Sequence, residues 1–528
     1  MAATVIVVGA GPVGQTAALL LAGWGLDVSV LDAAPARALA GSRSICQQRD
    51  VLDIWNHVGA HAIQEEGLTW TTARTFYRGR SIAESRFEVF PGTPPFVNLS
   101  QTRTEAILDR LIDAEPRIRL WWNQPVTRLI PGAESVSVHT PTDTYSADYA
   151  ILASGAHGGP IRDQLDIEFP GSTCPDRFLI CDVAADIPQW RTERHFHFDP
   201  PANPGRQLLI HPCPDDTFRI DWQVPPDYNE ATDRLDRRVH DVIGDRDYRL
   251  LWNTTYRFHS RVADRFNTGR ILLAGDVAHL CAPFGARGLN SGVPDAENAA
   301  WKIAVHAHGW AADSILDSYH AERYPAALEN QRVVDTTMRF LAPATDHDRR
   351  YRHDLLDAAV TDPGAAADID SGRFAEPYWY SASPLTTPDP DRPEPRRPAK
   401  NTGQPAAPGV IFPDGPPDMV SLRPSLRGAF TLVTRDERPD DWFHRETDAP
   451  TRYLALDRLE RGEELAEHMG LSPGECWLVR PDAHLAATLP EATPATVTAA
   501  LRRALGHAAG LSNDRPPTRN KPGRERRA

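Results

Sequence analysis

The chain has 528 residues, of which 41% are hydrophobic and 24% are charged, and its formal net charge is −14. This length exceeds one ordinary hydrophobic core, so two or three domains are expected, and the composition excludes a disordered or fibrous protein. The charge argues against nucleic acid as a partner, because a negative surface repels phosphate groups.

No apolar run reaches the length of a membrane span, so we expect no membrane partner. The opening MAATVIVVGAGP leads directly into a motif, without the basic and apolar regions of a signal peptide, and predicts a cytoplasmic protein. The six cysteines are scattered, with neither CxxC pairs nor zinc-type spacing. We therefore expect reduced thiols and no metal.

The first residues are predicted to form a strand, a helix and a second strand. Thr4 to Val8 is a β-branched and apolar run, Pro12 to Trp24 has helical periodicity, and Asp27 to Asp32 is again rich in β-forming residues. This order predicts a βαβ unit.

A glycine motif lies between the first strand and the helix of this unit. Its glycines are Gly9, Gly11 and Gly14, and Asp32 closes the second strand. Glycines let the backbone approach a pyrophosphate, the helix N-terminus attracts it, and a carboxylate accepts hydrogen bonds from ribose hydroxyls. The motif predicts a dinucleotide site and does not separate NAD from FAD; a glycine turn without nucleotide is the alternative.

A second sheet is predicted for residues 76–97 and 190–264, where aromatic and polar residues alternate, as in HFHF (195–198) and RIDWQV (219–224). Its aromatic residues either line a site for a flat ligand or fill the core of the sheet; they are Phe196, Phe198, Phe218 and Trp222. Four polar residues either face a ligand or are structural, and no catalytic base is assigned among them: His211, Asp221, Gln223 and Tyr256.

The first sheet is predicted to resume after Arg270, where the apolar run ILLAG precedes a glycine-rich loop. A helix is expected from about Gly292 to His308, continuing toward Tyr319. The nucleotide-binding domain is therefore discontinuous, and its predicted parts are residues 1–75, 98–189 and 265–380.

Three segments are expected after this domain. Residues 381–417 are dense in proline, which favours an extended linker. A small α/β module is predicted over 418–510, and a disordered basic tail over 511–528.

Two segments near the resumed sheet carry the resemblance to a known family. RILLAGDVAH from Arg270 and PFGARGLNSG from Pro283 resemble the flavin-binding signature of the class A aromatic hydroxylases, the family of para-hydroxybenzoate and phenol hydroxylases. The chain looks most similar to the longer members, which include 3-(3-hydroxyphenyl)propionate and polyketide hydroxylases. The resemblance covers about residues 3 to 340.

The resemblance implies FAD as the cofactor. It implies that Asp276 binds the ribityl chain and that backbone amides after the glycine-rich loop face the flavin N1 and C2 carbonyl. The loop and the residues that follow it are Pro283, Gly285, Gly288, Leu289 and Asn290. A helix N-terminus there, expected near Gly292, would stabilise the negative charge of reduced flavin.

Three further positions are carried over from the family as contacts of the ribityl-phosphate part or the adenine of FAD: Arg43, Gln101 and Val126. A surface ion pair is the alternative for Arg43, and a helix cap is the alternative for Gln101.

The chain departs from the family at two places. Ser154-Gly155 stands where the family has Asp-Gly, and the loop from there to Arg162 is one residue longer. That aspartate engages both flavin and nicotinamide in the family, so reduction by NAD(P)H is either impaired here or maintained by the serine. Pro294 replaces a polar residue and is expected in the first turn of its helix, where proline is tolerated.

The implied fold class is α/β, with a discontinuous Rossmann-like FAD-binding domain, an inserted β-sheet substrate domain formed by 76–97 and 190–264, and a C-terminal thioredoxin-like module. The module contains only Cys476, which cannot perform disulfide exchange alone, so a structural or dimerising role is expected. A homodimer is accordingly among the expectations.

The implied activity is that of an FAD-dependent monooxygenase. It hydroxylates a phenol-like aromatic small molecule through a flavin C4a-hydroperoxide, with NAD(P)H as electron donor and molecular oxygen as co-substrate. One alternative keeps FAD but performs Baeyer-Villiger, epoxidising or dearomatising chemistry in a biosynthetic pathway. Another is a non-catalytic protein that binds FAD and a ligand. Substrate identity, regiochemistry and the choice between NADH and NADPH stay open.

Overall fold

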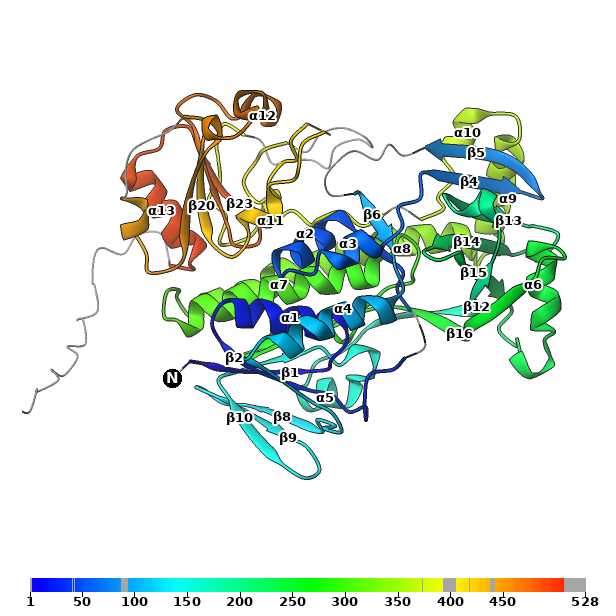
Figure 1. Ribbon diagram of the computed structural model, residues 1–528, viewed down its shortest axis with the longest axis horizontal. Coiled ribbons are helices and arrows are strands. Elements are labelled where there is room, and N and C mark those ends of the chain that lie inside the picture. The colour runs from blue at the N-terminus through cyan, green and yellow to red at the C-terminus, as the bar shows by residue number, and fades with distance from the viewer. Residues whose placement is uncertain are drawn as a thin grey trace, which may run out of the picture.

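The structure is a computed structural model that describes residues 2–39, 41, 43–86, 94–372, 374–392, 405–416, 418–436 and 442–507. The predicted linker 381–417 lies partly outside these residues, and the predicted tail 511–528 lies wholly outside them. The described residues form a mixed α/β structure in which two large sheets and a C-terminal unit occupy separate regions (Figure 1).

A six-stranded sheet contains the βαβ unit, and the prediction is confirmed: β1 (Thr4–Val8), α1 (Pro12–Gly23) and β2 (Asp27–Leu31) follow one another. The strand order is β17-β18-β11-β1-β2-β7, and all neighbours are parallel except β17 and β18. The other strands are β7 (Ile118–Trp121), β11 (Tyr149–Leu152), β17 (Asn267–Thr268) and β18 (Ile271–Leu273). The ILLAG run therefore returns to the N-terminal sheet as predicted.

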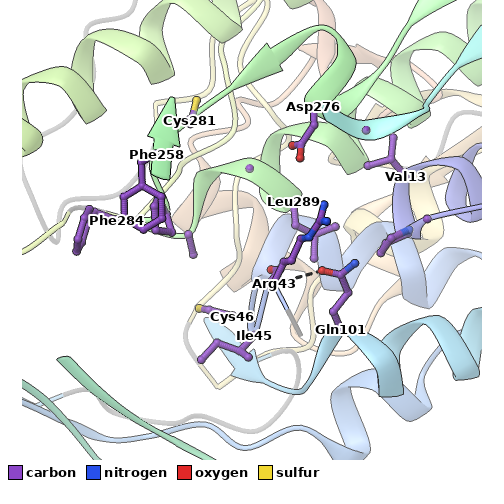
Figure 2. A pocket seen from close by; sticks show the side chains of 18 of the residues that line it. Val13, Arg43, Ile45, Cys46, Gln101, Phe258, Asp276, Cys281, Phe284 and Leu289 are labelled. Atoms are coloured by element: carbon purple, nitrogen blue, oxygen red, sulfur yellow. Dashed lines mark hydrogen bonds between the residues drawn. The ribbon is translucent and has the colours of Figure 1, made fainter. Parts of the chain in front are cut away.

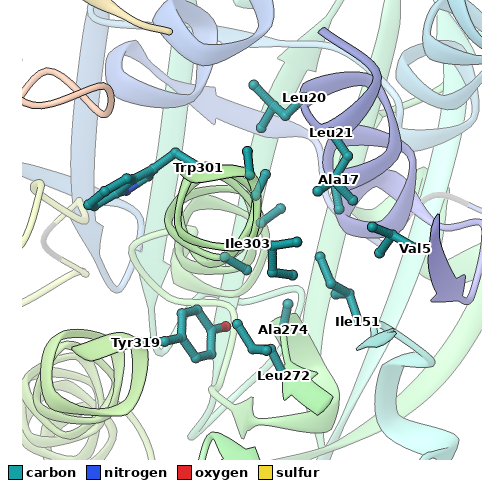
Figure 3. Packing of buried hydrophobic residues seen from close by; sticks show 14 of the residues in the cluster. Val5, Ala17, Leu20, Leu21, Ile151, Leu272, Ala274, Trp301, Ile303 and Tyr319 are labelled. Atoms are coloured by element: carbon teal, nitrogen blue, oxygen red, sulfur yellow. The ribbon is translucent and has the colours of Figure 1, made fainter. Parts of the chain in front are cut away.

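Long helices pack beside this sheet. Helix α1 contacts α4 (Gln101–Ala114) and α7 (Arg287–Ala307), and α7 contacts α8 (Ser314–Leu341). Figure 3 shows side chains of α1, α7 and α8 meeting those of β1, β11 and β18 in one buried cluster. Strands buried on both faces carry continuous apolar runs, which is why the run predicts β1 so well.

Helix α7 differs from the prediction at both ends. It begins at Arg287 and not near Gly292. The sequence did not predict this first turn, because Gly288 and Asn290 are poor helix formers. Pro294 consequently lies inside the helix, so its predicted place in the first turn is wrong; there it removes one backbone hydrogen bond. The expected continuation toward Tyr319 is also wrong, since α7 ends at Ala307 and α8 is a separate helix.

An eight-stranded sheet forms the second region, with the order β19-β16-β12-β15-β14-β13-β4-β5. HFHF lies on β13 and RIDWQV on β15, so both predicted strands are confirmed. The strands are β4 (Thr72–Tyr77), β5 (Arg80–Arg86), β12 (Gly171–Ala185), β13 (Glu193–Phe198), β14 (Gln207–Cys213), β15 (Thr217–Val224), β16 (Tyr248–Val262) and β19 (His279–Leu280). Neighbours are antiparallel except β13 and β4.

The limits of the two sheets differ from the sequence-based division. Strand β12, which that division grouped with the first sheet, pairs with β15 and β16 of the second. Its apolar run FLICDVAA resembles a buried parallel strand, which explains the error. Strand β6 (Phe96–Asn98), which the division assigned in part to the second sheet, pairs instead with β3 (Cys46–Gln48).

Smaller elements complete these two regions. A three-stranded antiparallel sheet consists of β8 (Arg128–Pro131), β9 (Val136–His139) and β10 (Thr144–Ala147). The shorter helices are α2 (Arg49–His57), α3 (Ala62–Glu66), α5 (Gly159–Gln164), α6 (Leu235–Ile243), α9 (Asp346–Ala359) and α10 (Pro363–Ala367).

The C-terminal unit is a four-stranded sheet with the order β21-β20-β22-β23, in which only β20 and β21 are parallel. Its strands are β20 (Phe430–Thr434), β21 (Thr451–Ala455), β22 (Cys476–Val479) and β23 (Leu485–Leu489). Its helices are α11 (Arg423–Leu426), α12 (Gly462–Met469) and α13 (Pro494–Ala504). The predicted small α/β composition of this segment is therefore confirmed.

Buried charges join this unit to α7 and α8. The Arg480 guanidinium donates to both Glu322 carboxylate oxygens at 2.6 and 2.9 Å and to Asp482 at 2.6 Å. Lys302 Nζ donates to Glu322 at 2.7 Å. All four side chains are at most 2% exposed.

A second buried contact lies nearby: Arg427 donates to Glu297 at 2.7 Å and to Asp50 at 2.8 Å.

Within the described ranges, no helix combines the length and apolar content that a membrane crossing requires.

Candidate functional site

One cavity of about 1160 Å³ lies where the two large sheets meet. Small-molecule sites usually measure about 300–1000 Å³, so this volume suits a large cofactor together with a second molecule. All predicted cofactor residues except Gly14 and Asn290 line it, namely Gly9, Gly11, Asp32, Arg43, Gln101, Val126, Asp276, Pro283, Gly285, Gly288 and Leu289. The cavity therefore brings together residues from distant parts of the chain.

The glycine motif forms one end of the cavity. Gly9 has φ +108°, and a Cβ there would stand 2.4 Å from the Ala153 carbonyl oxygen. Gly11 is the N-cap of α1, and a Cβ there would meet nothing within 4 Å. Gly14 allows close packing, since its Cβ would lie 2.0 Å from the Gly9 carbonyl oxygen. The free amides of the α1 N-terminus thus face open space that suits an anion.

Asp32 lies at the end of β2 beside this turn. Its Oδ2 accepts from the Ala10 amide at 2.7 Å, and its Oδ1 accepts from the Ala34 amide at 2.8 Å. The backbone amide of Gln124 donates to the Asp32 carbonyl at 2.8 Å and brings the neighbouring Val126 to the same wall. The carboxylate is therefore held rigidly at the cavity, where its remaining lone pairs can accept ligand hydroxyls.

Arg43 and Gln101 line the middle of the cavity. Arg43 Nε donates to the Tyr256 hydroxyl at 3.1 Å. Gln101 accepts from the Ser44 amide at 3.2 Å and donates to Glu105 at 2.9 Å. The N-cap of α4 is Ser100 and not Gln101, so the capping alternative for Gln101 is wrong. Figure 2 shows Arg43, Gln101, Asp276 and Leu289 around one part of the cavity.

Asp276 faces the cavity from the turn after β18. Its carboxylate makes no hydrogen bond within the described part of the chain, and burial raises its pKa, which nearby His279 and Arg43 oppose. A Cβ on Gly288 would lie 3.9 Å from Asp276 Oδ1, so the carboxylate stands next to the first turn of α7. The amides of Arg287, Gly288 and Leu289 lie in that turn, where helix amides have no partner within the helix.

A buried network holds this turn, and the sequence analysis did not predict it. Asp295 on α7 accepts from the Gly275 amide at 3.0 Å and from Arg323 Nε at 2.7 Å. It also contacts His279 Nε2 at 2.6 Å. Contact with Asp295 raises the pKa of His279 to about 10 despite burial, so the imidazole is charged. The only available signal was the spacing of His279 and Asp295 within the family motif.

A segment after α10 covers the glycine-rich loop before α7. The Ala375 amide donates to the Gly285 carbonyl at 3.3 Å, and Arg287 donates to the Phe374 carbonyl at 3.0 Å. Gly372 has φ +101°, and a Cβ there would lie 2.9 Å from the Gly285 amide nitrogen. Residues 369–372, 374 and 376 consequently line the cavity, which the sequence did not predict.

The side chains of Asn290 and Ser154 have surroundings that the sequence did not indicate. Asn290 does not line the cavity; its side chain bonds the backbone of Cys46, Gln48 and Ala286 at 2.6–2.9 Å and anchors β3. Ser154 lines the cavity, but its hydroxyl oxygen is buried and has no partner among the described residues. The serine hydroxyl is thus turned away from the open space.

The far end of the cavity is apolar, with a polar wall. Its aromatic residues are Trp70, Phe178, Phe258, Phe284 and Phe374. Phe258 and Phe284 stand apart from Asp276 in Figure 2. None of the four aromatic residues singled out by the alternation lines the cavity, because they pack in the cores of the sheet: Phe196, Phe198, Phe218 and Trp222. The polar wall is formed by Arg194, Gln207, His211, Arg219 and Asp221.

Of the four polar candidates, His211 and Asp221 line the cavity, whereas Gln223 and Tyr256 do not. Gln223 instead donates to Asp176 at 2.5 Å. Burial raises the pKa of Asp221 to about 7 and lowers the pKa of His211 well below its usual range.

The residues at the sheet junction fit FAD. A glycine turn at a helix N-terminus can bind a pyrophosphate, and Asp32 can accept hydrogen bonds from ribose hydroxyls. Asp276, which has no hydrogen-bond partner among the described residues, can accept hydrogen bonds from a polyhydroxyl chain. The α7 N-terminus can face a flavin that gains negative charge. Because the cavity extends beyond these residues, its aromatic end remains open to a second ligand.

Comparisons with known proteins agree with this fit. The family described as "FAD binding domain" matches residues 2–336. A "Flavin-dependent monooxygenase" of Mycobacteroides abscessus is 31% identical over 372 residues, covering 65% of this chain and 75% of that protein. A "3-(3-hydroxy-phenyl)propionate/3-hydroxycinnamic acid hydroxylase" of Klebsiella pneumoniae is 28% identical over 361 residues, covering 65% and 63%. The solved structure of the flavin-dependent monooxygenase PieE has a TM-score of 0.80 at 20% identity, covering 96% of this chain and 100% of that one.

The chain therefore belongs to the FAD binding domain family. Within it, the chain is a flavin-dependent monooxygenase of the aromatic hydroxylase type, an oxidoreductase that uses FAD. The non-catalytic alternative is thereby set aside.

Proposed function

We propose that this enzyme hydroxylates a phenol-like aromatic small molecule, with NAD(P)H as electron donor and molecular oxygen as the second substrate. The observation that carries the proposal is the continuity of this cavity, which extends from the glycine turn to an apolar, aromatic chamber. FAD bound in the first part would supply activated oxygen to the second. Both relatives and neighbours are monooxygenases, and the Klebsiella relative is named for phenolic substrates.

The proposed cofactor contacts follow from the geometry. Gly9, Gly11 and the α1 N-terminus would hold the pyrophosphate, and Asp32 the adenine ribose, with Arg43, Gln101 and Val126 along the remaining length. Asp276 would accept from the ribityl hydroxyls, and the amides of Gly288 and Leu289 would face the flavin edge. Asn290 and Gly14 would act indirectly, by anchoring β3 and by packing α1.

The aromatic chamber would exclude water from the reacting ring. Phe258 and Phe284 have centroids 6.0 Å apart in an edge-on arrangement, and Phe178 stacks on Phe258 at 4.3 Å. Such rings pack against a flat substrate with little loss of entropy. Dry surroundings also prevent loss of activated oxygen to water.

We propose domains that correspond to these parts. The parallel strand order supports a Rossmann-like FAD-binding domain, and the eight-stranded sheet supports an inserted substrate domain that includes β12. The mixed sheet of the C-terminal unit is compatible with a thioredoxin-like module. A cytoplasmic location fits a reductant such as NAD(P)H and six free cysteines. The homodimer stays a prediction.

The test is anaerobic stopped-flow reduction of the FAD-loaded protein by NADPH and by NADH, with and without a panel of phenols, followed at the flavin absorbance. Bleaching that a phenol accelerates, followed by a product one oxygen heavier when air is admitted, would support the proposal. If no phenol changes the bleaching rate and no oxygenated product forms, the proposal is wrong. The structure of the product separates hydroxylation from Baeyer-Villiger or epoxidising chemistry.

A further inference from the structure

The cavity-facing side of the eight-stranded sheet carries a row of charged residues. Asp182 on β12 pairs in register with Arg219 on β15, and Arg219 pairs with His211 on β14. Asp221 follows two residues after Arg219, so both side chains lie on the same face of β15. Arg194 comes from β13, on the other side of β14. Of these residues, Arg194, His211, Arg219 and Asp221 belong to the polar wall of the aromatic chamber, and Asp182 supports Arg219 from outside the cavity lining.

Arg219 is fully engaged within the protein. Its Nε and Nη2 donate to the two Asp182 carboxylate oxygens at 2.8 and 2.9 Å, and its Nη1 donates to the Arg43 carbonyl at 3.0 Å. This ion pair is bidentate, and its side chains are mostly buried: Arg219 is 4% exposed and Asp182 is 18% exposed. Its charge is therefore balanced and is not available to a ligand.

Arg194, in contrast, forms no ion pair with any carboxylate in the described ranges. Its Nη2 donates to the Ser371 carbonyl at 3.1 Å, and its guanidinium lies 5.5 Å from the Phe196 ring centroid. Burial lowers its pKa to about 10, so it remains charged at neutral pH. The adjacent Cys46 thiol supplies no anion, since burial raises its pKa to about 12. A half-buried cation of this kind favours an anion in the chamber.

Asp221 is the acid group that complements this cation. Its Oδ1 is buried without a hydrogen-bond partner among the described residues, and the residue lines the chamber. Burial raises its pKa to about 7, with Arg219 and Arg194 opposing the shift and Asp182 adding to it. His211 on the adjacent strand is neutral, and its Nδ1 has no partner either. Two thiols near Asp221, Cys181 and Cys213, stay protonated because burial raises the pKa of each.

We propose that Asp221 accepts the proton of the substrate hydroxyl group and that Arg194 binds the oxyanion that this transfer leaves. The O–H bond of the substrate breaks, an O–H bond forms on the Asp221 carboxylate, and the electron pair stays on the substrate oxygen. No oxidant or reductant takes part. The negative charge moves from Asp221 to the substrate oxygen beside Arg194, so the total charge of the wall and the substrate together is unchanged. This inference rests on the proposed hydroxylase function and names the substrate class as weakly acidic phenols.

The test compares Asp221→Asn with wild type on two phenols of different acidity. A proton acceptor contributes about 10²- to 10⁴-fold, so Asp221→Asn should lose about that much turnover on unsubstituted phenol. The loss should be much smaller on 4-nitrophenol, which ionises in water without help. The rise of the wild-type rate through the pKa of about 7 of Asp221 should disappear in the variant. An equal loss on both phenols, or an unchanged pH profile, would overturn the proposal.

A matched control is Asp215→Asn, which makes the same chemical change on the exposed turn between β14 and β15, outside the cavity. It should retain wild-type turnover and pH profile. Bound FAD, measured by absorbance, should be equal in all variants, which shows that folding is intact. Asp221→Glu should restore part of the turnover on phenol.

Arg194 has a separate readout in binding. Arg194→Gln should weaken binding of 4-nitrophenol at least 10-fold while leaving 4-nitroanisole, its methyl ether, nearly unchanged. Equal weakening of both ligands would overturn the role of Arg194. If wild type neither binds nor oxidises any phenol, the proposed function itself fails; if wild type is active and only the variant results disagree, only the assignment of Asp221 and Arg194 fails.

Discussion

The Asp295 carboxylate lies 2.6 Å from His279 Nε2, with both side chains at most 1% exposed. The same carboxylate binds the Gly275 amide and Arg323, so it fixes the turn that presents Asp276 to the cavity. Asp295 is thus a positioning residue: it holds the turn that carries Asp276 without lining the cavity itself.

Replacing Asp295 by Asn should destabilise the fold and weaken FAD binding. Removing one partner of a buried ion pair typically costs about 3–5 kcal/mol, because the other charge is left unpaired. Urea unfolding and the dissociation constant for FAD measure the two effects. Full FAD affinity in a stable variant would contradict the positioning role.

The His279 contact should make stability depend on alkaline pH. Its pKa in the folded state is raised from 6.5 to about 10, so its contribution is fully present below about pH 6.5 and is lost as pH rises through about 10. His279→Asn should remove this loss of stability between the two pH values. The measurement is the urea midpoint of wild type and variant between about pH 6.5 and pH 10. If both midpoints fall equally with rising pH, the His279 contact does not cause the loss of stability.

Two glycines of the N-terminal turn should respond differently to alanine. At Gly9, a Cβ would clash with the Ala153 carbonyl at φ +108°, so Gly9→Ala should impair folding. At Gly11 there is open space, so Gly11→Ala should fold normally but bind FAD more weakly, since the methyl group would occupy the proposed pyrophosphate site. Thermal unfolding and bound flavin separate the two cases. Gly23→Ala, also in open space but outside the cavity, is the control. Wild-type affinity in Gly11→Ala would refute the assignment.

Ser154 should be dispensable. Its hydroxyl oxygen is buried and unpartnered in the described structure, so Ser154→Ala should be neutral or stabilising, by at most about 1–3 kcal/mol. The rate of flavin reduction by NAD(P)H should not change. Slower reduction in stopped-flow experiments would instead mean that the hydroxyl turns toward the cofactor in the working enzyme.

Arg480 should be essential for stability. Among the described residues, Arg480→Met would leave buried Glu322 with Lys302 as its one cationic partner, at a cost of about 3–5 kcal/mol in urea unfolding. Arg461→Gln, which removes an exposed pair with Glu464 and Asp418, is the control and should leave the midpoint unchanged. A midpoint for Arg480→Met equal to that of the control would show that the cluster is not needed.

Local motifs predicted several residues at the glycine-turn end of the cavity, because Gly9, Gly11 and Asp32 lie close together in one strand, helix and strand. The sequence analysis did not predict the start of α7, because Gly288 and Asn290 in its first turn are poor helix formers. In the chamber, residues from several strands meet only through sheet register, and each strand presents alternate residues to either face. His211 and Asp221 could be named as polar candidates from their strands, but Arg194 was not among the candidates. Gln223 and Tyr256, which were candidates, lie outside the cavity lining.

Helix α7 links the two ends of the molecule. Its first turn meets Asp276, while Glu297 and Lys302, farther along, join buried charges that reach the C-terminal unit through Arg427 and Glu322. Chimeras that exchange the C-terminal unit between relatives would therefore need to transfer Arg427, Arg480 and Asp482 in matched form, or leave uncompensated charges against the helix whose first turn lines the cavity. The C-terminal unit can therefore be exchanged only together with the residues of α7 and α8 that its charges contact.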